Sequence, residues 1–175
     1  MNPILKKLTG TDRRSTGRSD EVVAEVLADP TLFDAVFEGM LADDPVLRMR
    51  AADAVEKITA QHPEYLRPYK SKLIGQVARI DQQEVRWHVA QMFSRLDLRR
   101  AERRRVADLL AEYLQDESKI VKTFSMQALA DIAEQDADLR PSILMQLQEL
   151  TRTGSPAMQS RGRKLLARLA RMFDT

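Results

Sequence analysis

Side chains that could carry out acid–base, nucleophilic or metal chemistry are few in this chain and do not form a recognisable set. His62 and His88 are the two histidines, cysteine is absent, and neither histidine has a partner at the spacing of metal ligands. Asp53 and Asp131 lie about two repeat units apart, too far to share a proton as a catalytic pair. Gly154-Ser155-Pro156 is typical of a turn, and no Gly-rich phosphate loop or Ser-His-Asp arrangement is found. We therefore expect a protein that is not an enzyme and has no cofactor, with a lone general base on a helix surface as the catalytic alternative.

Basic residues gather in three segments although the net charge is only +2. Residues 1–19 hold five basic and one acidic side chain, residues 95–105 hold six and two, and residues 152–175 hold six and one. Such clusters bind acidic partners or the phosphates of nucleic acids. However, Glu102 and Asp108 interrupt the central cluster, and aromatic residues for base stacking do not alternate with the basic ones. The alternative interpretation is that these residues lie at solvated helix ends, where positive charge is favourable.

Composition indicates a globular, cytoplasmic protein. Apolar residues make up 43% of the 175 residues and charged residues 31%, which is too hydrophobic for a disordered chain. No stretch has the length and apolar character of a membrane span, and the first residues lack the pattern of a cleavable leader. We expect residues 1–18 to form a flexible tail and residues 19–175 to form one domain.

Self-similarity is the strongest signal in the sequence. Four segments begin at Leu47, Val85, Val121 and Met158, which lie 38, 36 and 37 residues apart. In each segment, apolar or small residues occupy positions 0, +4, +7, +8 and +11, which form one face of an α-helix. This buried stripe comprises Leu47, Ala51, Ala54, Val55 and Ile58, then Val85, Val89, Met92, Phe93 and Leu96, then Val121, Ser125, Ala128, Leu129 and Ile132, and finally Met158, Gly162, Leu165, Leu166 and Leu169. Position +4 is never large, so we expect a neighbouring helix to cross closely there.

The segments between these stripes repeat as well, so each unit is predicted to be a pair of helices, A followed by B. Asp, Ser and Pro residues before each B helix suit a helix start, because they cap or dispense with the first free N–H groups. The pattern predicts A helices near 31–42, 64–80, 101–115 and 139–152, and B helices near 46–61, 83–97, 118–134 and 156–173. A short helix near 20–28 is expected to cover the first pair.

Over residues 30–173 the chain resembles the HEAT-repeat family. The resemblance rests on a turn Asp followed by an apolar–basic pair in three units, and the fourth unit departs from it. The matching residues are Asp44 with Leu47-Arg48, Asp81 with Val85-Arg86, and Asp116 with Val121-Lys122, against Gly154 with Met158-Gln159 in the last unit. The resemblance implies an all-α, right-handed α–α superhelix (solenoid) of about four helix pairs, with residues 19–175 as a single HEAT-repeat domain. It does not imply one activity, because such solenoids serve as adaptors, transport receptors, phosphatase scaffolds, bilin lyase subunits and DNA glycosylases.

Position +1 of the four B helices holds Arg48, Arg86, Lys122 and Gln159. The family resemblance implies a structural role, in which the basic side chain bridges to the Asp of a turn. The alternative is a track of positive charge for phosphates.

The predicted partner-binding residues lie on the exposed surface of the B helices, which forms the concave face in HEAT-like proteins. They are Arg50, Trp87, His88, Gln91, Arg95, Phe124, Arg161, Lys164 and Arg168. Trp87 and Phe124 are candidate anchors for a partner, with packing between repeats as the alternative. We expect a protein–protein interaction scaffold or adaptor whose partner has acidic character. A nucleic-acid-binding protein, related to DNA glycosylases or not, and a bilin-lyase-like accessory subunit of an enzyme complex are the alternatives, and the oligomeric state stays open.

Overall fold

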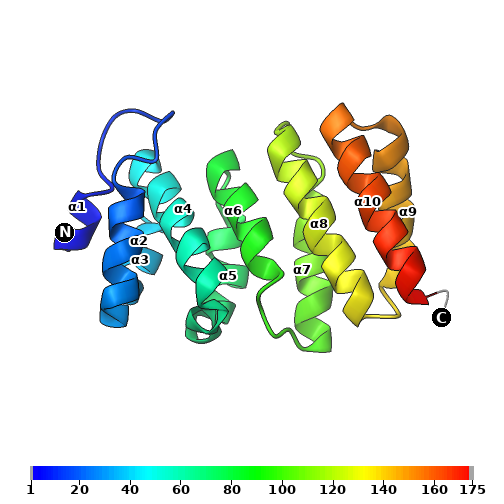
Figure 1. Ribbon diagram of the computed structural model, residues 1–175, viewed down its shortest axis with the longest axis horizontal. Helices are drawn as coiled ribbons and strands as arrows, with labels where there is room; N and C mark the ends of the chain where they lie inside the picture. Colours follow the sequence, from blue (N-terminus) through cyan, green and yellow to red (C-terminus); the bar gives the residue numbers. More distant parts are fainter. Residues whose placement is uncertain (1, 174–175) are drawn as a thin grey trace. The chain divides into compact units, whose positions relative to one another are not determined.

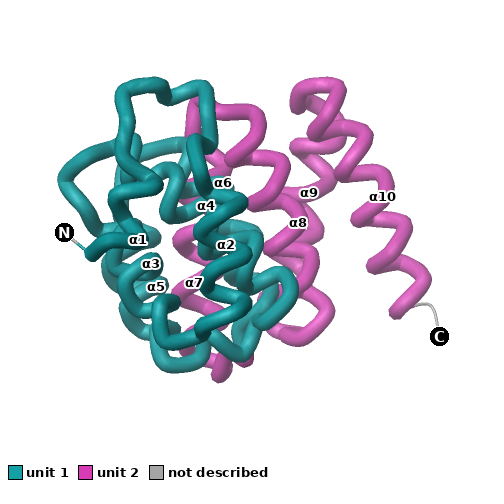
Figure 2. Tube along the Cα trace, turned by 60° about the vertical axis from the view of Figure 1, so that its left-hand side comes forward, with its two compact units in different colours: residues 1–96 teal, residues 97–175 magenta. Residues whose placement is uncertain are grey.

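Residues 2–173 are described by a computed structural model, and every regular element among them is helical. The chain divides into two compact units, Met1–Leu96 and Asp97–Thr175 (Figure 2). None of the helices within residues 2–173 has both the length and the apolar composition that crossing a membrane requires. The all-α prediction is confirmed for the described residues, while the assignment of residues 19–175 to one domain stays a prediction.

Within residues 2–96, the first unit contains six α-helices, most of them short (Figure 1). Asp44 caps α4 by accepting a hydrogen bond from the Val46 N–H at 2.8 Å, and Pro45 occupies the first helical position. The predicted cover near 20–28 is present as α2, which packs against α4. The helices are α1 (Pro3–Lys6), α2 (Ser19–Ala28), α3 (Phe33–Gly39), α4 (Pro45–Gln61), α5 (Lys70–Gly75) and α6 (Gln83–Phe93), with single 3-10 turns at Pro30–Leu32 and Val77–Arg79 and a longer 3-10 segment at Pro63–Tyr69.

The prediction of one continuous A helix over residues 64–80 is wrong. The segment consists of the 3-10 stretch Pro63–Tyr69, the short α5 and a 3-10 turn at Val77–Arg79. Pro68 has no N–H to donate to a preceding carbonyl, so a regular α-helix cannot run through it undisturbed. Leu66, Leu73 and Val77 are nevertheless fully buried, so the apolar positions were assigned correctly although the helix was not.

Residues 2–18 also differ from the expected tail. They contain α1, in which Ile4 is buried, and a loop that follows the fully buried Leu8. Helix α1 packs against α3. The folded part of the first unit therefore begins well before Ser19, because these two apolar side chains supply core contacts that the sequence analysis did not assign.

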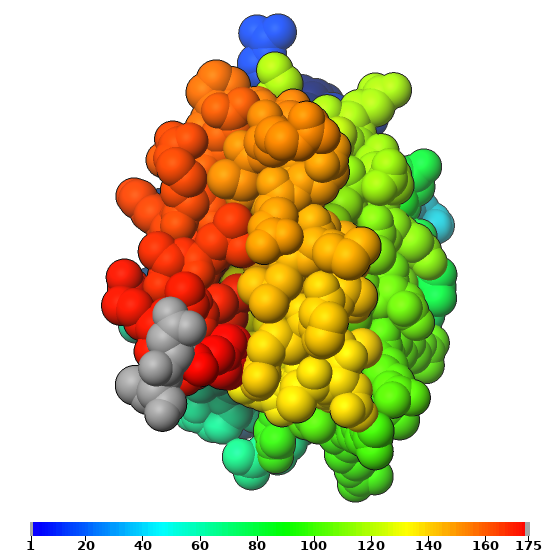
Figure 3. Space-filling model, turned by 90° about the vertical axis from the view of Figure 1, so that its right-hand side faces the viewer, coloured from blue at the N-terminus to red at the C-terminus, as the bar shows by residue number. Residues whose placement is uncertain are grey.

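The second unit consists of two helix pairs, α7 (Arg100–Tyr113) with α8 (Lys119–Gln135) and α9 (Arg140–Thr153) with α10 (Pro156–Phe173). Helix α8 packs against α7, α9 and α10, and Figure 3 shows α9 and α10 side by side on one face. Ser118 caps α8 by accepting from the Val121 N–H at 3.4 Å, as the turn residues predicted. The four B helices predicted from the repeat are thus α4, α6, α8 and α10.

The predicted buried stripe is confirmed along all four B helices. Each of its members is buried except Leu166 in α10, which is half-buried. The small residues at position +4 are all buried. The polar Ser125 is tolerated there because its hydroxyl donates to the Val121 carbonyl at 2.7 Å. At Gly162, a β-carbon would overlap the hydroxyl oxygen of Thr151 in α9 and lie 3.1 Å from Met126 Cε in α8.

Replacing Gly162 by Ala is expected to destabilise the chain by about 1–3 kcal/mol, because the added methyl overpacks the crossing of α10 with α9. Helix propensity acts in the opposite direction, since Ala favours a helix by about 1 kcal/mol over Gly. Urea unfolding followed by circular dichroism measures the balance. In a Thr151→Ala background the same change should cost less, and an equal loss in both backgrounds would contradict this account of the crossing.

Candidate functional site

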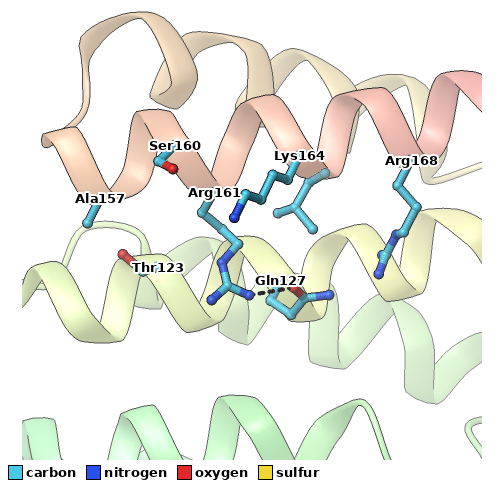
Figure 4. A pocket seen from close by; sticks show the side chains of 8 residues that line it. Thr123, Gln127, Ala157, Ser160, Arg161, Lys164 and Arg168 are labelled. Atoms are coloured by element: carbon cyan, nitrogen blue, oxygen red, sulfur yellow. Dashed lines mark hydrogen bonds between the residues drawn. The ribbon is translucent and has the colours of Figure 1, made fainter.

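A groove of about 520 Å³ lies between α8 and α10 in the second unit (Figure 4). Three of the predicted partner-binding residues, Arg161, Lys164 and Arg168, line it from α10. They follow one another at intervals of three and four residues, which places them on one face of the helix. The remaining lining residues are Thr123, Gln127, Ala157, Ser160 and Leu165.

The three cations of this groove differ in how their charge is balanced. Arg168 donates to Asp131 Oδ1 at 2.7 Å, and its Nε lies 2.7 Å from Glu134 Oε1 without the alignment of a hydrogen bond. Arg161 donates to the neutral Gln127 Oε1 at 2.8 Å and has no carboxylate partner within residues 2–173. Lys164 is exposed and has no ion pair within that range either. The positive charge of the groove therefore resides at Arg161 and Lys164.

The pairing of Arg168 belongs to a series at position +10 of the B helices. Lys57 lies 2.7 Å from Asp20 Oδ1, and Arg168 lies 2.7 Å from Asp131 Oδ1, in both cases 37 residues earlier in the chain. Between them in sequence, Arg95 forms an ion pair with Glu56 and donates to the Thr59 hydroxyl at 2.9 Å. The sequence analysis placed Arg95 and Arg168 on a free surface. In the sequence, each of these two arginines has an acidic residue about one repeat earlier, and this pattern could have indicated that Arg95 and Arg168 bind the preceding B helix.

Part of the basic cluster at 95–105 is balanced in the same way, whereas Arg99 and Arg105 have no ion pair within residues 2–173. Arg103 donates to Asp136 Oδ2 at 3.0 Å, and this hydrogen bond is the main reason why the pKa of Asp136 is lowered. Arg100 forms an ion pair with Asp138, and Arg104 lies 3.8 Å from the same carboxylate. In contrast, Arg168 is the one basic residue of α10 with an ion pair inside the described range.

Of the four residues at position +1, only Arg86 pairs with the side chain of a turn Asp within residues 2–173, as the structural interpretation predicted. Arg48 donates to the Ala42 carbonyl and to Gln82 Oε1, each at 2.9 Å. Arg86 lies 3.1 Å from Asp81, and Gln159 donates to the Gly154 carbonyl at 3.0 Å. Arg48, Arg86 and Gln159 thus tie three of the A–B turns to their B helices, whereas Lys122 has no such contact among the described residues.

Arg50 is buried, contrary to its assignment to the exposed surface. With only 5% of its surface exposed, its guanidinium donates to four backbone carbonyls of the N-terminal segment. The acceptors are Leu8 at 3.2 Å, Thr9 at 2.6 Å, Asp12 at 3.0 Å and Ser15 at 3.0 Å. We call Arg50 and residues 8–17 the N-terminal clasp. Because its donors are occupied, Arg50 is removed from the set of free partner-binding residues.

Two glycines allow the clasp to close around the guanidinium. Gly10 has φ of 154° and Gly17 has φ of 59°, conformations that side chains disfavour. A β-carbon at either position would lie within 2.6–2.7 Å of Arg50 Nη1. The backbone can therefore reach Arg50 at both places only because no side chain intervenes.

The clasp stands where the repeat would place the beginning of another B helix. Asp20, the partner of Lys57, is the second residue of α2, whereas Asp131, the partner of Arg168, is the thirteenth residue of α8. Helix α2 thus lacks about three turns at its start. Arg50, at position +3, contacts the chain segment that takes their place.

Replacing Arg50 by Ala is expected to destabilise the chain by about 1–3 kcal/mol and to release residues 8–17, since their carbonyls lose a charged donor. Thermal unfolding measures the first effect, and the rate of trypsin cleavage after Arg13 and Arg14 measures the second. Arg18→Ala is the matched control, because Arg18 pairs only with Glu21 at the surface. Unchanged cleavage in Arg50→Ala would show that the clasp holds without its guanidinium.

The remaining predicted residues of the first unit surround a separate cavity of about 290 Å³. Trp87 and His88 of α6 line it, with Met49 and Asp53 of α4 and residues 13–16 of the clasp. Trp87 is half-buried and Gln91 donates to its carbonyl at 3.2 Å, while Phe124, in the second unit, is also half-buried. The structure therefore brings Trp87 and His88 together, but neither aromatic anchor lines the groove between α8 and α10.

His88 is held beside Asp53, with Nε2 4.0 Å from Oδ1. Burial lowers the pKa of His88, and the nearby carboxylates of Asp53 and Glu56 offset part of this effect. Asp53 is already bound to the Ser19 hydroxyl at 2.5 Å and to Lys57 at 2.8 Å. No set of three His, Asp or Glu residues suited to a metal ion occurs within residues 2–173. Because its pKa is lowered, the half-buried His88 is neutral at neutral pH.

The lowered pKa of His88 predicts that acidification destabilises the chain. The folded state binds fewer protons than the unfolded state near the ordinary histidine value of about 6.5, so the free energy of unfolding falls as the pH falls through that value. The slope is at most about 1.4 kcal/mol per pH unit. Urea unfolding at pH 7.5 and 5.5 should show a smaller difference for His88→Gln than for the unaltered chain. The surface variant His62→Gln should retain the full difference, and an unchanged difference in His88→Gln would refute the assignment.

Comparison with known proteins adds no assignment: neither a protein-family model, nor a curated protein, nor a solved structure matches this chain. The groove between α8 and α10 is therefore the candidate functional site of the described chain. Thr123 and Ser160, which the sequence analysis did not single out, belong to it together with Gln127. All three lie on the predicted exposed surface, and only the packing of α10 on α8 brings them together.

Proposed function

We propose that this chain is a non-catalytic protein-binding scaffold, a solenoid of HEAT-type helix pairs whose groove between α8 and α10 binds an acidic segment of a partner protein. The observation that carries the proposal is the unbalanced charge of Arg161 and Lys164 inside a groove. In the described chain, Arg95 and Arg103 are paired with carboxylates, and so is Arg168 at the other end of the groove. The repeat spacing and the residues at its turns support the HEAT-type assignment.

A partner segment would gain both charge and shape complementarity in this groove. The side chains from Arg161 to Arg168 span two helical turns, about 10 Å, which an extended chain covers with three residues. Complementary charge at such a surface accelerates association and selects the partner. Asp131 and Glu134 keep the Arg168 end close to neutral, so the acidic residue of the partner belongs at the other end.

Nucleic-acid binding is the second candidate, and α10 favours it. The helix carries Arg161, Arg163, Lys164, Arg168 and Arg171 and no acidic residue. Phosphates would bind these charges regardless of base sequence. The residues that line the groove include no aromatic side chain on which a base could stack. An accessory subunit of an enzyme complex would use the groove in the way proposed for a protein partner.

The proposal predicts that charge reversal inside the groove weakens binding far more than the same change outside it. A fluorescein-labelled ten-residue peptide of alternating Glu and Gly is the probe, with fluorescence anisotropy at low salt as the measurement. Lys164→Glu should raise the Kd at least about tenfold, equivalent to about 1.4 kcal/mol. Arg163 is exposed and lies outside the groove, and Arg163→Glu changes the charge by the same amount. This variant should raise the Kd by less than about threefold.

Two outcomes would overturn this assignment. Equal losses in the two variants would show a diffuse attraction to α10 instead of a site. Tighter binding of a labelled twenty-nucleotide single strand, weakened equally by both variants and steeply by salt, would favour nucleic acid. Circular dichroism of each variant confirms that the helices are intact before binding is compared.

A further inference from the structure

The two unbalanced cations of the groove point toward the same space. Arg161 and Lys164 stand three residues apart on α10, and Figure 4 shows both side chains leaving the helix on the side that faces α8. Ser160, next to them, is exposed and its hydroxyl has no partner within residues 2–173. A guanidinium, an ammonium and a hydroxyl are thus offered along one turn of helix.

We propose that the anion bound here is a phosphate monoester, carried by a phosphorylated serine or threonine in an extended partner segment. This inference rests on the proposed function and specifies its ligand. A phosphate monoester carries a charge of about −1.5 to −2 at pH 7 and so matches both cations, whereas one carboxylate would balance only one of them. The planar fork of an arginine and the point charge of a lysine are a common pair of phosphate ligands.

Gln127 positions the guanidinium without neutralising it. Its Oε1 accepts from Arg161 at 2.8 Å, while its Nε2 donates to Asp131 Oδ1 at 3.0 Å. Asp131 is in turn fixed by Arg168 at 2.7 Å. The orientation of Arg161 is therefore set through a neutral amide, and its remaining N–H groups stay available for a ligand. A guanidinium fixed in this way loses little freedom when an anion binds.

The repeat offers an internal precedent for an arginine that binds a non-helical segment. Arg50 and Arg161 both occupy position +3 of their B helices, and Arg50 binds four carbonyl oxygens of the clasp. Arg161 has the same reach but only Gln127 as a partner among the described residues. Arg161 of α10 is therefore available to bind a segment of another chain in the way that Arg50 binds a segment of its own chain.

The groove also limits where the phosphate can bind. Asp131 and Glu134 would repel a dianion at the Arg168 end, so the phosphate belongs beside Arg161 and Lys164. The partner residue that reaches toward Arg168 should be neutral or basic. Thr123, at the opposite end of the groove beside Ala157 and Ser160 (Figure 4), acts only as an acceptor, since its hydroxyl donates to the Lys119 carbonyl at 2.7 Å.

Three labelled ten-residue peptides test the inference, alike except for a central phosphoserine, Glu or Ser in a Gly-Ser background. The phosphoserine peptide should bind at least about tenfold more tightly than the Glu peptide, and the Ser peptide most weakly. Arg161→Lys keeps the charge but removes the fork, and should weaken the phosphoserine peptide at least about fivefold. Lys164→Gln, at an exposed position that folding does not depend on, should weaken it similarly, whereas Arg163→Lys and Arg163→Gln should have little effect.

The outcomes separate this inference from the proposed function. Equal affinity for the phosphoserine and Glu peptides, sensitive to Lys164→Gln, would overturn the phosphate assignment and leave the acidic-segment site intact. If neither peptide binds and the chain also fails to bind the Glu-Gly probe, both the phosphate assignment and the proposed acidic-segment site would be overturned. Binding of inorganic phosphate as tight as that of the phosphoserine peptide, or tighter binding of the single strand, would show that no phosphorylated protein segment is recognised.

Discussion

The packing of the two B helices within each unit, α4 against α6 and α8 against α10, through one small-and-aliphatic face is the constraint on which each unit depends. Position +4 holds Ala51, Val89, Ser125 and Gly162, so neighbouring backbones can approach there. Close approach fixes the distance between side chains one repeat apart. It thereby decides which charged residues meet, since a pair such as Arg168 and Asp131 forms only when the two helices are near enough.

The pairing of basic with acidic side chains one repeat apart, more than the number of basic residues, defines the candidate site. The chain holds 28 basic side chains, and a surface judged by their positions alone would include most of the B helices. Once Arg50, Arg95 and Arg168 are assigned to contacts within their own units, the unbalanced charge of the groove reduces to Arg161 and Lys164. Function is therefore proposed for a groove in which a cation without a carboxylate partner is oriented by a neutral side chain.

The sequence was sufficient to predict the elements that follow the repeat, because burial at a fixed period leaves a direct trace in residue types. The four B helices and the burial of Val89 and Phe93 follow from that period. The prediction from the sequence was wrong at residues 64–80, because Pro68 breaks the helix while the apolar positions keep their spacing. It also failed at Arg50, because contacts from a guanidinium to backbone carbonyls leave no pattern in side-chain types. Of the predicted partner-binding residues, Arg161, Lys164 and Arg168 line the groove. The contact between Arg161 and Gln127 could not be predicted from the sequence, because it depends on how α10 packs on α8.

The N-terminal clasp also bears on where the chain can be shortened. The repeat pattern alone would suggest Ser19 as a safe first residue, since the first predicted helix begins beside it. A chain that began there would lack Ile4 and Leu8 from its core and would leave a buried guanidinium without its four oxygen acceptors. Such a shortened protein would be prone to aggregate through the uncovered end of α4, so residues 2–18 cover that end of the first unit.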